Sequence, residues 1–195
     1  MPDTGAPWNI PYVASTDLVS DWPADSLALA NAIDAGLDAA GNAGIGSNVV
    51  QTVKTDVFST TSGTFTPVTG LSVAITPTSA TAKVLVICQI IWSGGGTNHG
   101  AFKMTRGGTD VYIGDAASNR LRAVFAGNGA PDLGDTALPG AIVFLDSPAT
   151  TSSTTYQVEA AATAGFVAVN RSNVDTDNAT FVRGASSITA IEVAV

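Results

Sequence analysis

Period-two alternation of apolar and polar residues recurs from residue 47 onward, and it constrains the fold more than any other feature of the chain. Such alternation is typical of strands that bury one face. About eight or nine segments are expected to be strands, among them 49–57, 71–75, 84–92, 102–106, 109–113, 141–146, 154–162, 166–170 and 187–195. No helical pattern separates them. The sequence therefore predicts a mainly β protein, with an antiparallel β-sandwich or jelly-roll-like domain over residues 47–195.

The clearest hairpin covers residues 102–113 around the two-residue turn Gly107-Gly108. This turn predicts that Arg106 pairs with Thr109, Met104 with Val111 and Phe102 with Ile113. The apolar side chains of these pairs then share one face, and Lys103 lies opposite Tyr112 on the other. Residues 114–140 are rich in glycine and proline, and we expect a long loop or an irregular strand there.

Two of the predicted strands are apolar on both faces, namely residues 84–92 and 141–145. A two-layer antiparallel sandwich normally presents one face of each sheet to water. Mean hydropathy is +0.29 and only 12% of residues are charged, against about 25% in ordinary soluble domains. We therefore expect part of the outer surface to be covered by further copies of the chain.

Residues 1–46 form a separate segment with six aspartates and no lysine or arginine. Pro7, Pro11 and Pro23 favour an extended arm over residues 7–23. Its large apolar side chains need a partner surface, and we expect them to anchor the protein to other proteins: Trp8, Ile10, Tyr12, Leu18 and Trp22. A short helix follows, with Asp21 as its N-cap and glycines at 41 and 44 ending it.

Four residues of this helix follow a coiled-coil-like spacing: Ala30, Ile33, Leu37 and Ala40. The pattern spans about two heptads, and Gly36 weakens it. One interpretation packs the helix on its own β domain. The other, which the spacing favours, places it in a short bundle about a symmetry axis.

Composition argues against several classes of partner. All eight basic residues lie after residue 46, together with ten acidic ones, and no basic cluster suited to nucleic acid is present. The longest apolar run is too short to span a membrane. We therefore expect neither nucleic-acid binding nor membrane insertion.

Residues that could support catalysis are sparse. Cys88 lies in an apolar run, where a buried, inert thiol is expected, and His99 lies in a glycine-rich turn. Serine-hydrolase, zinc-site and phosphate-loop motifs are missing from the sequence, so we expect no enzyme activity and no cofactor. Asp175 and Asp177 are the best candidates for a metal site, although a polar turn is the favoured interpretation.

Short motifs in both parts of the chain resemble those of bacteriophage virion surface proteins, including short tail fibres, minor tail proteins and capsid decoration proteins. The leader motifs are Asn9-Ile10-Pro11-Tyr12, Thr16-Asp17-Leu18-Val19, Asp21-Trp22-Pro23 and residues 29–34; those of the body are residues 75–80, 144–151, 155–156 and 186–192. The resemblance implies a trimeric, jelly-roll-like head on a short N-terminal anchor, without catalytic residues. The extended shaft of long tail fibres is missing.

The resemblance implies a protein of the virion, assembled in the host cytoplasm. The first hypothesis is a non-enzymatic, homotrimeric short fibre that residues 1–46 attach to other virion proteins, with loops 94–100, 127–134 and 175–178 contacting a host glycan or protein. The first alternative is a capsid decoration (cement) protein that stabilises the head. A minor alternative is a carbohydrate-binding module.

Overall fold

The computed structural model describes residues 22–42, 45–95, 99–128 and 136–193. Contacts divide the chain into one unit of residues 1–47 and a second of residues 48–193, which we call the head. The predicted extended arm falls almost entirely on residues 1–21, outside the described residues.

The described part of the first unit is a helix, α1 (Trp22–Asn42). This confirms the helix expected from the leader, with Pro23 in its first turn, where the missing amide donor costs no intrahelical hydrogen bond. Apolar side chains on α1 are exposed, including Leu27 at 62%, Ile33 at 46% and Leu37 at 65%. An isolated helix of this length gains little stability from its own hydrogen bonds.

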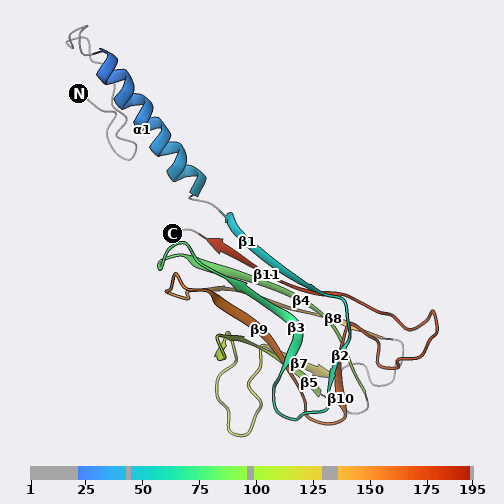
Figure 1. Ribbon diagram of the computed structural model, residues 1–195. Coiled ribbons are helices and arrows are strands. Elements are labelled where there is room, and N and C mark those ends of the chain that lie inside the picture. Colours follow the sequence, from blue (N-terminus) through green and yellow to red (C-terminus); the bar gives the residue numbers. More distant parts are fainter. Residues whose placement is uncertain (1–21, 43–44, 96–98, 129–135, 194–195) are drawn as a thin grey trace. The chain divides into compact units, whose positions relative to one another are not determined.

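The head consists of two antiparallel sheets, as predicted (Figure 1). The first sheet contains β1 (Ile45–Lys54), β2 (Phe58–Thr60), β4 (Lys83–Gly95), β8 (Leu138–Asp146), β10 (Phe166–Val169) and β11 (Ser186–Val193). The second contains β3 (Thr66–Ile75), β5 (His99–Arg106), β6 (Thr109–Val111), β7 (Phe125–Asn128) and β9 (Thr154–Ala162).

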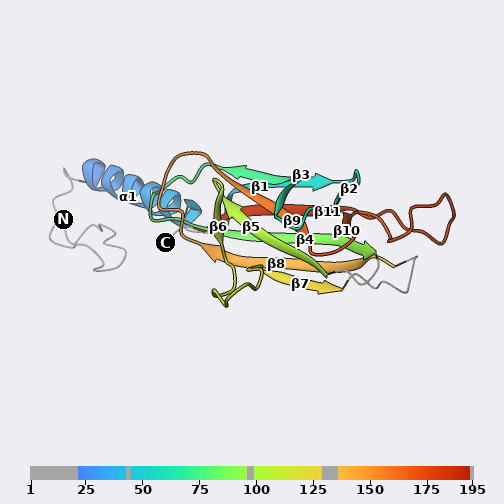
Figure 2. The ribbon, with the colours of Figure 1, turned by 90° about the horizontal axis from the view of Figure 1, so that it is seen from below.

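The strand order is that of a jelly roll. In the first sheet β1, β11, β4 and β8 lie side by side, and in the second β3, β9, β5 and β7 do so. Figure 2 shows the two sheets stacked, with each of these four strands of the first sheet lying against a strand of the second. Most connections cross from one sheet to the other, which produces the nested Greek keys of this architecture. The predicted fold class is confirmed.

The core lies between the two layers. Val84, Val86 and Ile90 of β4 are fully buried, as are Tyr156 and Val158 of β9. At one end of this core Trp92, Phe102 and Phe125 form an aromatic cluster, with ring centroids 5.4 Å apart for Trp92–Phe102 and 4.9 Å apart for Phe102–Phe125. Gly140 makes room for it, because a Cβ there would lie 2.5 Å from Cζ of Phe125.

The predicted register of the hairpin is confirmed for the pairs near its turn and is wrong for the pairs farther from it. Arg106 pairs with Thr109 and Met104 with Val111. Phe102, however, pairs with Phe125 of β7 and not with Ile113. The chain leaves the sheet at Tyr112, which has a φ of 51°, so β6 ends there and the predicted Lys103–Tyr112 pair is lost. The glycine-rich stretch 114–140 supplies β7 as the replacement neighbour of β5.

The first predicted strand is present as β1, but Val49 and Val53 do not face the core. Val49 and Val53 are 50% and 56% exposed, whereas Lys54 is 2% exposed. Val50 packs against the core from the inner face. The alternation of apolar and polar residues in β1 was therefore recognised, while the side that it buries was not.

Candidate functional site: an uncharged outer sheet face

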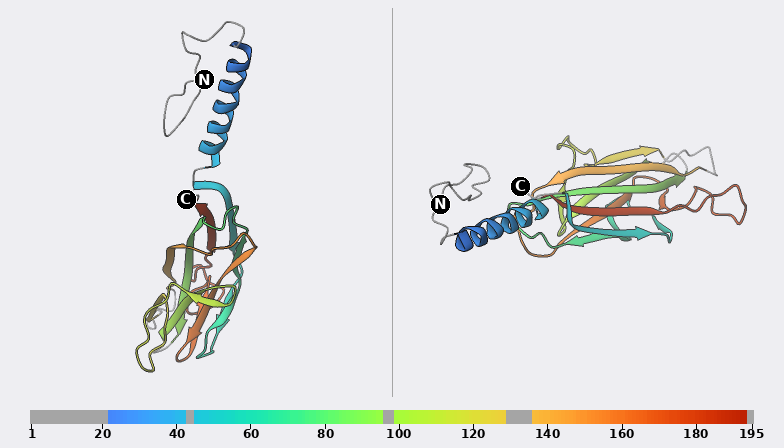
Figure 3. Two further views of the ribbon diagram at one scale, coloured as in Figure 1. Left: turned by 90° about the vertical axis from the view of Figure 1, so that its left-hand side faces the viewer. Right: turned by 90° about the horizontal axis from the view of Figure 1, so that it is seen from above.

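The outer face of the first sheet carries rows of apolar side chains that run across neighbouring strands. Ile191 of β11, Leu85 of β4 and Leu145 of β8 lie in register in one row. Thr189, Ile87 and Val143 form the next row. Figure 3 (right) views the head from above, with β8 in orange, β4 in green and β11 in red lying side by side.

Strand β1 extends this face beyond β11. The Gln51 amide nitrogen donates to Oγ1 of Thr189 at 2.8 Å, which puts Gln51 on the same side as the rows. Val49 and Val53, two positions away on either side, point the same way. We call this surface the apolar face, defined by Val49, Val53, Ile87, Val143 and Leu145 with the side chains between them.

The apolar face carries no charge over the rows that the structure describes. A third row, formed by Ser187, Gln89 and Ala141, is polar but neutral. Lys83 begins β4 opposite Val193 and is the first charged residue along these strands on this side. The acidic side chains of β11 and β8, Glu192 and Asp146, pair with Val84 on the inner side of the sheet.

The side chains of the apolar face are substantially accessible. Ile87 is 39% exposed, Val143 52% and Leu145 51%, beside the two valines of β1. Burying the exposed half of such a side chain contributes about 1 kcal/mol. Contiguous exposed apolar surface of this kind is typical of a protein interface. The prediction that residues 84–92 and 141–145 are apolar on both sides is confirmed.

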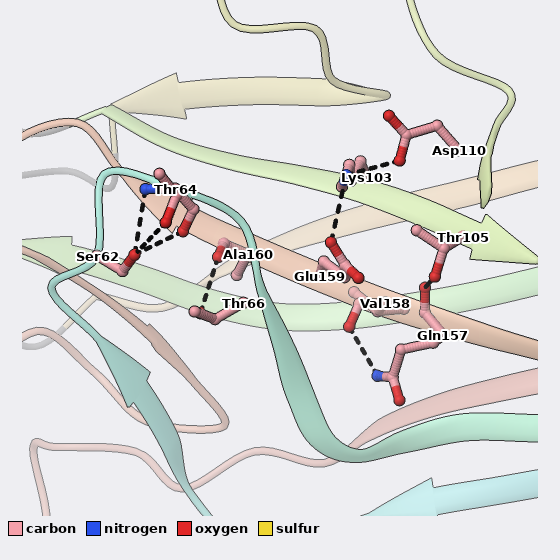
Figure 4. Close-up of polar contacts among 10 residues, drawn as sticks. All are labelled: Ser62, Thr64, Thr66, Lys103, Thr105, Asp110, Gln157, Val158, Glu159 and Ala160. Atoms are coloured by element: carbon pink, nitrogen blue, oxygen red, sulfur yellow. Dashed lines mark hydrogen bonds and ion pairs between the residues drawn. The ribbon is translucent and has the colours of Figure 1, made fainter. Parts of the chain in front are cut away.

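The outer face of the second sheet has the opposite character (Figure 4). The ammonium of Lys103 lies 2.6 Å from Oδ1 of Asp110 and 3.3 Å from Oε2 of Glu159. Burial lowers the pKa of Lys103, but the two carboxylates outweigh it and the net pKa is raised. The ammonium also lies 4.8 Å from the ring centroid of Phe65. The outer face of the second sheet therefore carries paired charges, whereas the rows of the apolar face carry none.

Most of the residues predicted to be functional are not brought together by the structure. Ala30, Ile33 and Leu37 are exposed on α1, while the side chain of Ala40 lies outside the description. Trp8, Ile10, Tyr12 and Leu18 also lie outside the described residues, and Trp22 is described only as the backbone start of α1. Anchoring and the seam stay predictions.

Asp175 and Asp177 line a hollow of about 350 Å³ in the loop between β10 and β11. Arg183 neutralises Asp175, with its Nη2 2.5 Å from Oδ1, and Nε of Arg171 lies 4.0 Å from Oδ2. Among the described residues, no three His, Cys, Asp or Glu side chains come together as metal ligands would. A carboxylate already paired with arginine is a poor cation ligand, and the polar-turn interpretation fits this loop.

Cys88 is 1% exposed, and burial raises the pKa of its thiol to about 12. This confirms the buried, unreactive thiol expected from the sequence, since the thiolate is the nucleophilic form.

A buried carboxylate that no sequence pattern predicts lies near the end of β11, between β1 and β4. Glu192 is 1% exposed and accepts hydrogen bonds from Asn48 Nδ2 at 2.9 Å, Thr78 N at 2.8 Å and Thr78 Oγ1 at 2.5 Å. Burial raises the pKa of Glu192, but these donors outweigh it and the net pKa is lowered. The group links β1, β11 and the turn after β3.

A second polar cluster missed by sequence reasoning lies at the end of β10. Asn170 is fully buried with a φ of 65°, and its amide donates to the carbonyls of Lys54 at 2.8 Å and Asp56 at 3.0 Å. Its Oδ1 accepts from Oγ of Ser186 at 2.6 Å. The Lys54 ammonium is buried and lies 2.8 Å from Oδ2 of Asp56. Both clusters join loops to strands.

No helix in the described part of the chain is long and apolar enough to cross a membrane. No protein-family model matches the sequence. Comparison with curated proteins finds no match either. Among solved structures, a chain in the structure of infectious bursal disease virus, Gx strain, is similar at 16% identity and a TM-score of 0.36. The similarity covers 77% of this chain and 39% of that one. A similarity at this level does not establish a shared function.

Proposed function

We propose that this protein is a non-enzymatic bacteriophage virion component, a short trimeric appendage whose residues 1–46 attach it to the particle and whose jelly-roll head contacts the host surface. The observation that supports this most directly is the apolar face, which lacks charge and exposes five large aliphatic side chains. A solvent-facing sheet would carry pairs such as Lys103–Asp110, as the second sheet does.

The apolar face is proposed to be the surface between copies. Equal faces around a symmetry axis cover one another without leaving an open edge. Because only neutral side chains meet there, association leaves no buried unpaired charge, which would cost several kcal/mol. The polar second sheet and its loops then stay outside and remain free for contact with the host.

The proposed anchor is the aspartate-rich leader. Six aspartates without a basic residue favour a positively charged docking surface on another virion protein. Jelly rolls occur in both capsid and lectin domains. The architecture is therefore compatible with the proposed appendage. This support is an analogy of fold, because no functional site is shared.

The mass of the protein in solution tests the oligomer. We expect three times the chain mass of 19.6 kDa for the native sequence at micromolar concentration, measured by light scattering after size exclusion. Val143→Lys places a charge in the apolar face and should shift the protein toward monomer. Thr155→Lys, which adds the same charge to the exposed outer side of the second sheet, should leave the trimer intact. A native protein that is a stable monomer would refute the proposal.

The decoration-protein alternative uses the same face between copies but needs no host ligand. Adsorption competition separates the two roles. Purified appendage should compete with phage for cells, whereas a cement protein should not compete and should be present in large copy number on the capsid.

A further inference from the structure

The loop between β6 and β7, residues 112–124, combines unpaired positive charge with hollowed surface. Five basic side chains of the head form ion pairs: Lys54, Lys103, Arg106, Arg171 and Arg183. For Arg120, Arg122 and Lys83, no acidic side chain of the described residues lies within 4.0 Å. A chain with net charge −8 has carboxylates enough to pair every cation. Two neighbouring arginines that have no acidic partner among the described residues therefore create a local positive surface.

Both arginines line a hollow of about 280 Å³, together with Leu121 and Phe125. A second hollow of about 230 Å³ is lined by Tyr112 and adjoins the first, since both include Gly114, Ala123 and Val124. Ligand pockets for small molecules begin at about 300 Å³. The joined hollows are thus suited to a ligand of one or two sugar rings. Figure 1 shows this loop in yellow-green, below the second sheet.

Hydrogen bonds within the loop hold one arginine in place. Nε of Arg122 donates to the Gly114 carbonyl at 2.8 Å, and the Gly114 amide donates to the Ala123 carbonyl at 3.2 Å. Within the described residues, neither terminal nitrogen of Arg122 donates a hydrogen bond. Tyr112 and Ser118 have φ values of 51° and 53°, in the left-handed region that costs a non-glycine residue about 1 kcal/mol or more. Such strain concentrates at ligand sites.

We propose that this loop binds a saccharide that carries one carboxylate or phosphate group. The planar guanidinium of Arg122 would hold the anion through two parallel hydrogen bonds, and Arg120 would add charge. Leu121, which is 43% exposed, offers apolar surface to the C–H face of a sugar ring. Asp115 also lines the hollow and disfavours ligands that carry more than one anionic group. The site lies within one head, so it goes beyond the proposed appendage role and does not depend on trimer formation.

The test measures dissociation constants by calorimetry for four compounds on the full chain: glucuronate, glucose 6-phosphate, glucose and inorganic phosphate. We expect both anionic sugars to bind and glucose not to bind. Arg122→Gln should weaken both by about tenfold or more, the size of a lost charged hydrogen bond. Lys83→Gln removes an equal charge elsewhere and should change nothing. Asp115→Asn should tighten binding.

Several outcomes would overturn the proposal. One is equal binding by the native protein and Arg122→Gln, and another is an equal loss in Lys83→Gln. Failure of both anionic sugars to bind the native protein would do the same. If inorganic phosphate bound as tightly as glucose 6-phosphate, the loop would be a general anion site, and the proposed recognition of the sugar would be wrong. Arg122 is exposed, so an unchanged thermal melting curve confirms that its variant is folded. Light scattering on the same samples reports trimer formation separately.

Discussion

Glu192, Asn170 and Lys54 are the buried polar side chains that tie the head together at the scale of single residues. Each lies at or near the end of a strand. Glu192 and Asn170 bond to groups far away in sequence, and the Lys54 ammonium pairs with Asp56. No cation of the described residues lies within 4.0 Å of the Glu192 carboxylate, which relies on neutral donors from Asn48 and Thr78. A buried carboxylate without those donors would be costly. These residues therefore select one arrangement of the loops around the core.

Because of Glu192, we expect part of the free energy of unfolding to depend on pH in the acidic range. The folded pKa is lowered from its ordinary value of 4.5. The contribution is therefore complete above about pH 4.5 and is lost as the pH falls through the folded pKa. Glu192→Gln should lower the free energy of unfolding at pH 7 by about 1–3 kcal/mol, because the amide leaves buried donors unsatisfied. Urea denaturation should show the difference between native and variant narrowing on acidification.

Glu159→Gln is the matched control, since Glu159 is the other glutamate of the chain and lies on the outer side of the second sheet. That variant leaves the donors to Glu192 in place, so the part of the acid dependence that Glu192 supplies should remain. A constant difference between native and Glu192→Gln at all pH values would contradict the prediction.

At the scale of single strands, the neighbouring strand decides the pairing register, which the alternation of apolar and polar residues does not specify. Strand β3 loses its register with β9 between Pro67 and Ser72, where Gly70 has a φ of 77°. The Gln157 amide donates to the carbonyls of Val68 at 3.0 Å and Leu71 at 3.1 Å, so a side chain replaces part of the backbone ladder. A bulge of this kind depends on contacts with the partner strand, so the periodicity of the sequence does not predict it.

The helix α1 yields a prediction at the same scale. Leu37 and Ile33 are exposed, and the proposed bundle would bury them. The double variant Ile33→Lys/Leu37→Lys should weaken self-association, measured by sedimentation equilibrium, and leave the melting temperature of the head unchanged. Asn31→Lys/Ala35→Lys, at exposed positions on the opposite side of α1, is the control. Unchanged association in the Ile33/Leu37 variant would exclude these side chains from the interface.

At the scale of the whole molecule, the head has its own core, and the described part of the leader is the single helix α1. Completing the burial of five side chains on the apolar face supplies on the order of 5 kcal/mol per copy. Association itself costs about 4–15 kcal/mol. The face and the helix are therefore both needed for a stable trimer under the proposed function.

Removal of the leader tests this division. The buried core of the head lies entirely within residues 48–193. A fragment of residues 45–195, which keeps β1 whole, should therefore unfold cooperatively near the melting temperature of the full chain. Calorimetry measures this directly. The same fragment should associate more weakly than the full chain, and a fragment that is unfolded at 25 °C would contradict an independent head.

The sequence by itself determined the class of fold and the existence of most elements. Alternation located the strands, Gly107-Gly108 specified the pairs nearest the turn, and the doubly apolar runs indicated an outer face without charge. These features are local, since turn chemistry and side-chain period act over a few residues.

Tertiary structure alone decided which face of β1 turns inward, which strand pairs with Phe102 and how Glu192 and Asn170 are satisfied. Alternation defines two faces but does not say which one meets the opposite sheet. In β1 the inward side carries Lys54, whose ammonium reaches Asp56, and Val49 and Val53 point outward. That choice depends on neighbours brought in from distant parts of the chain, and the same long-range packing placed Arg120 and Arg122 around one hollow.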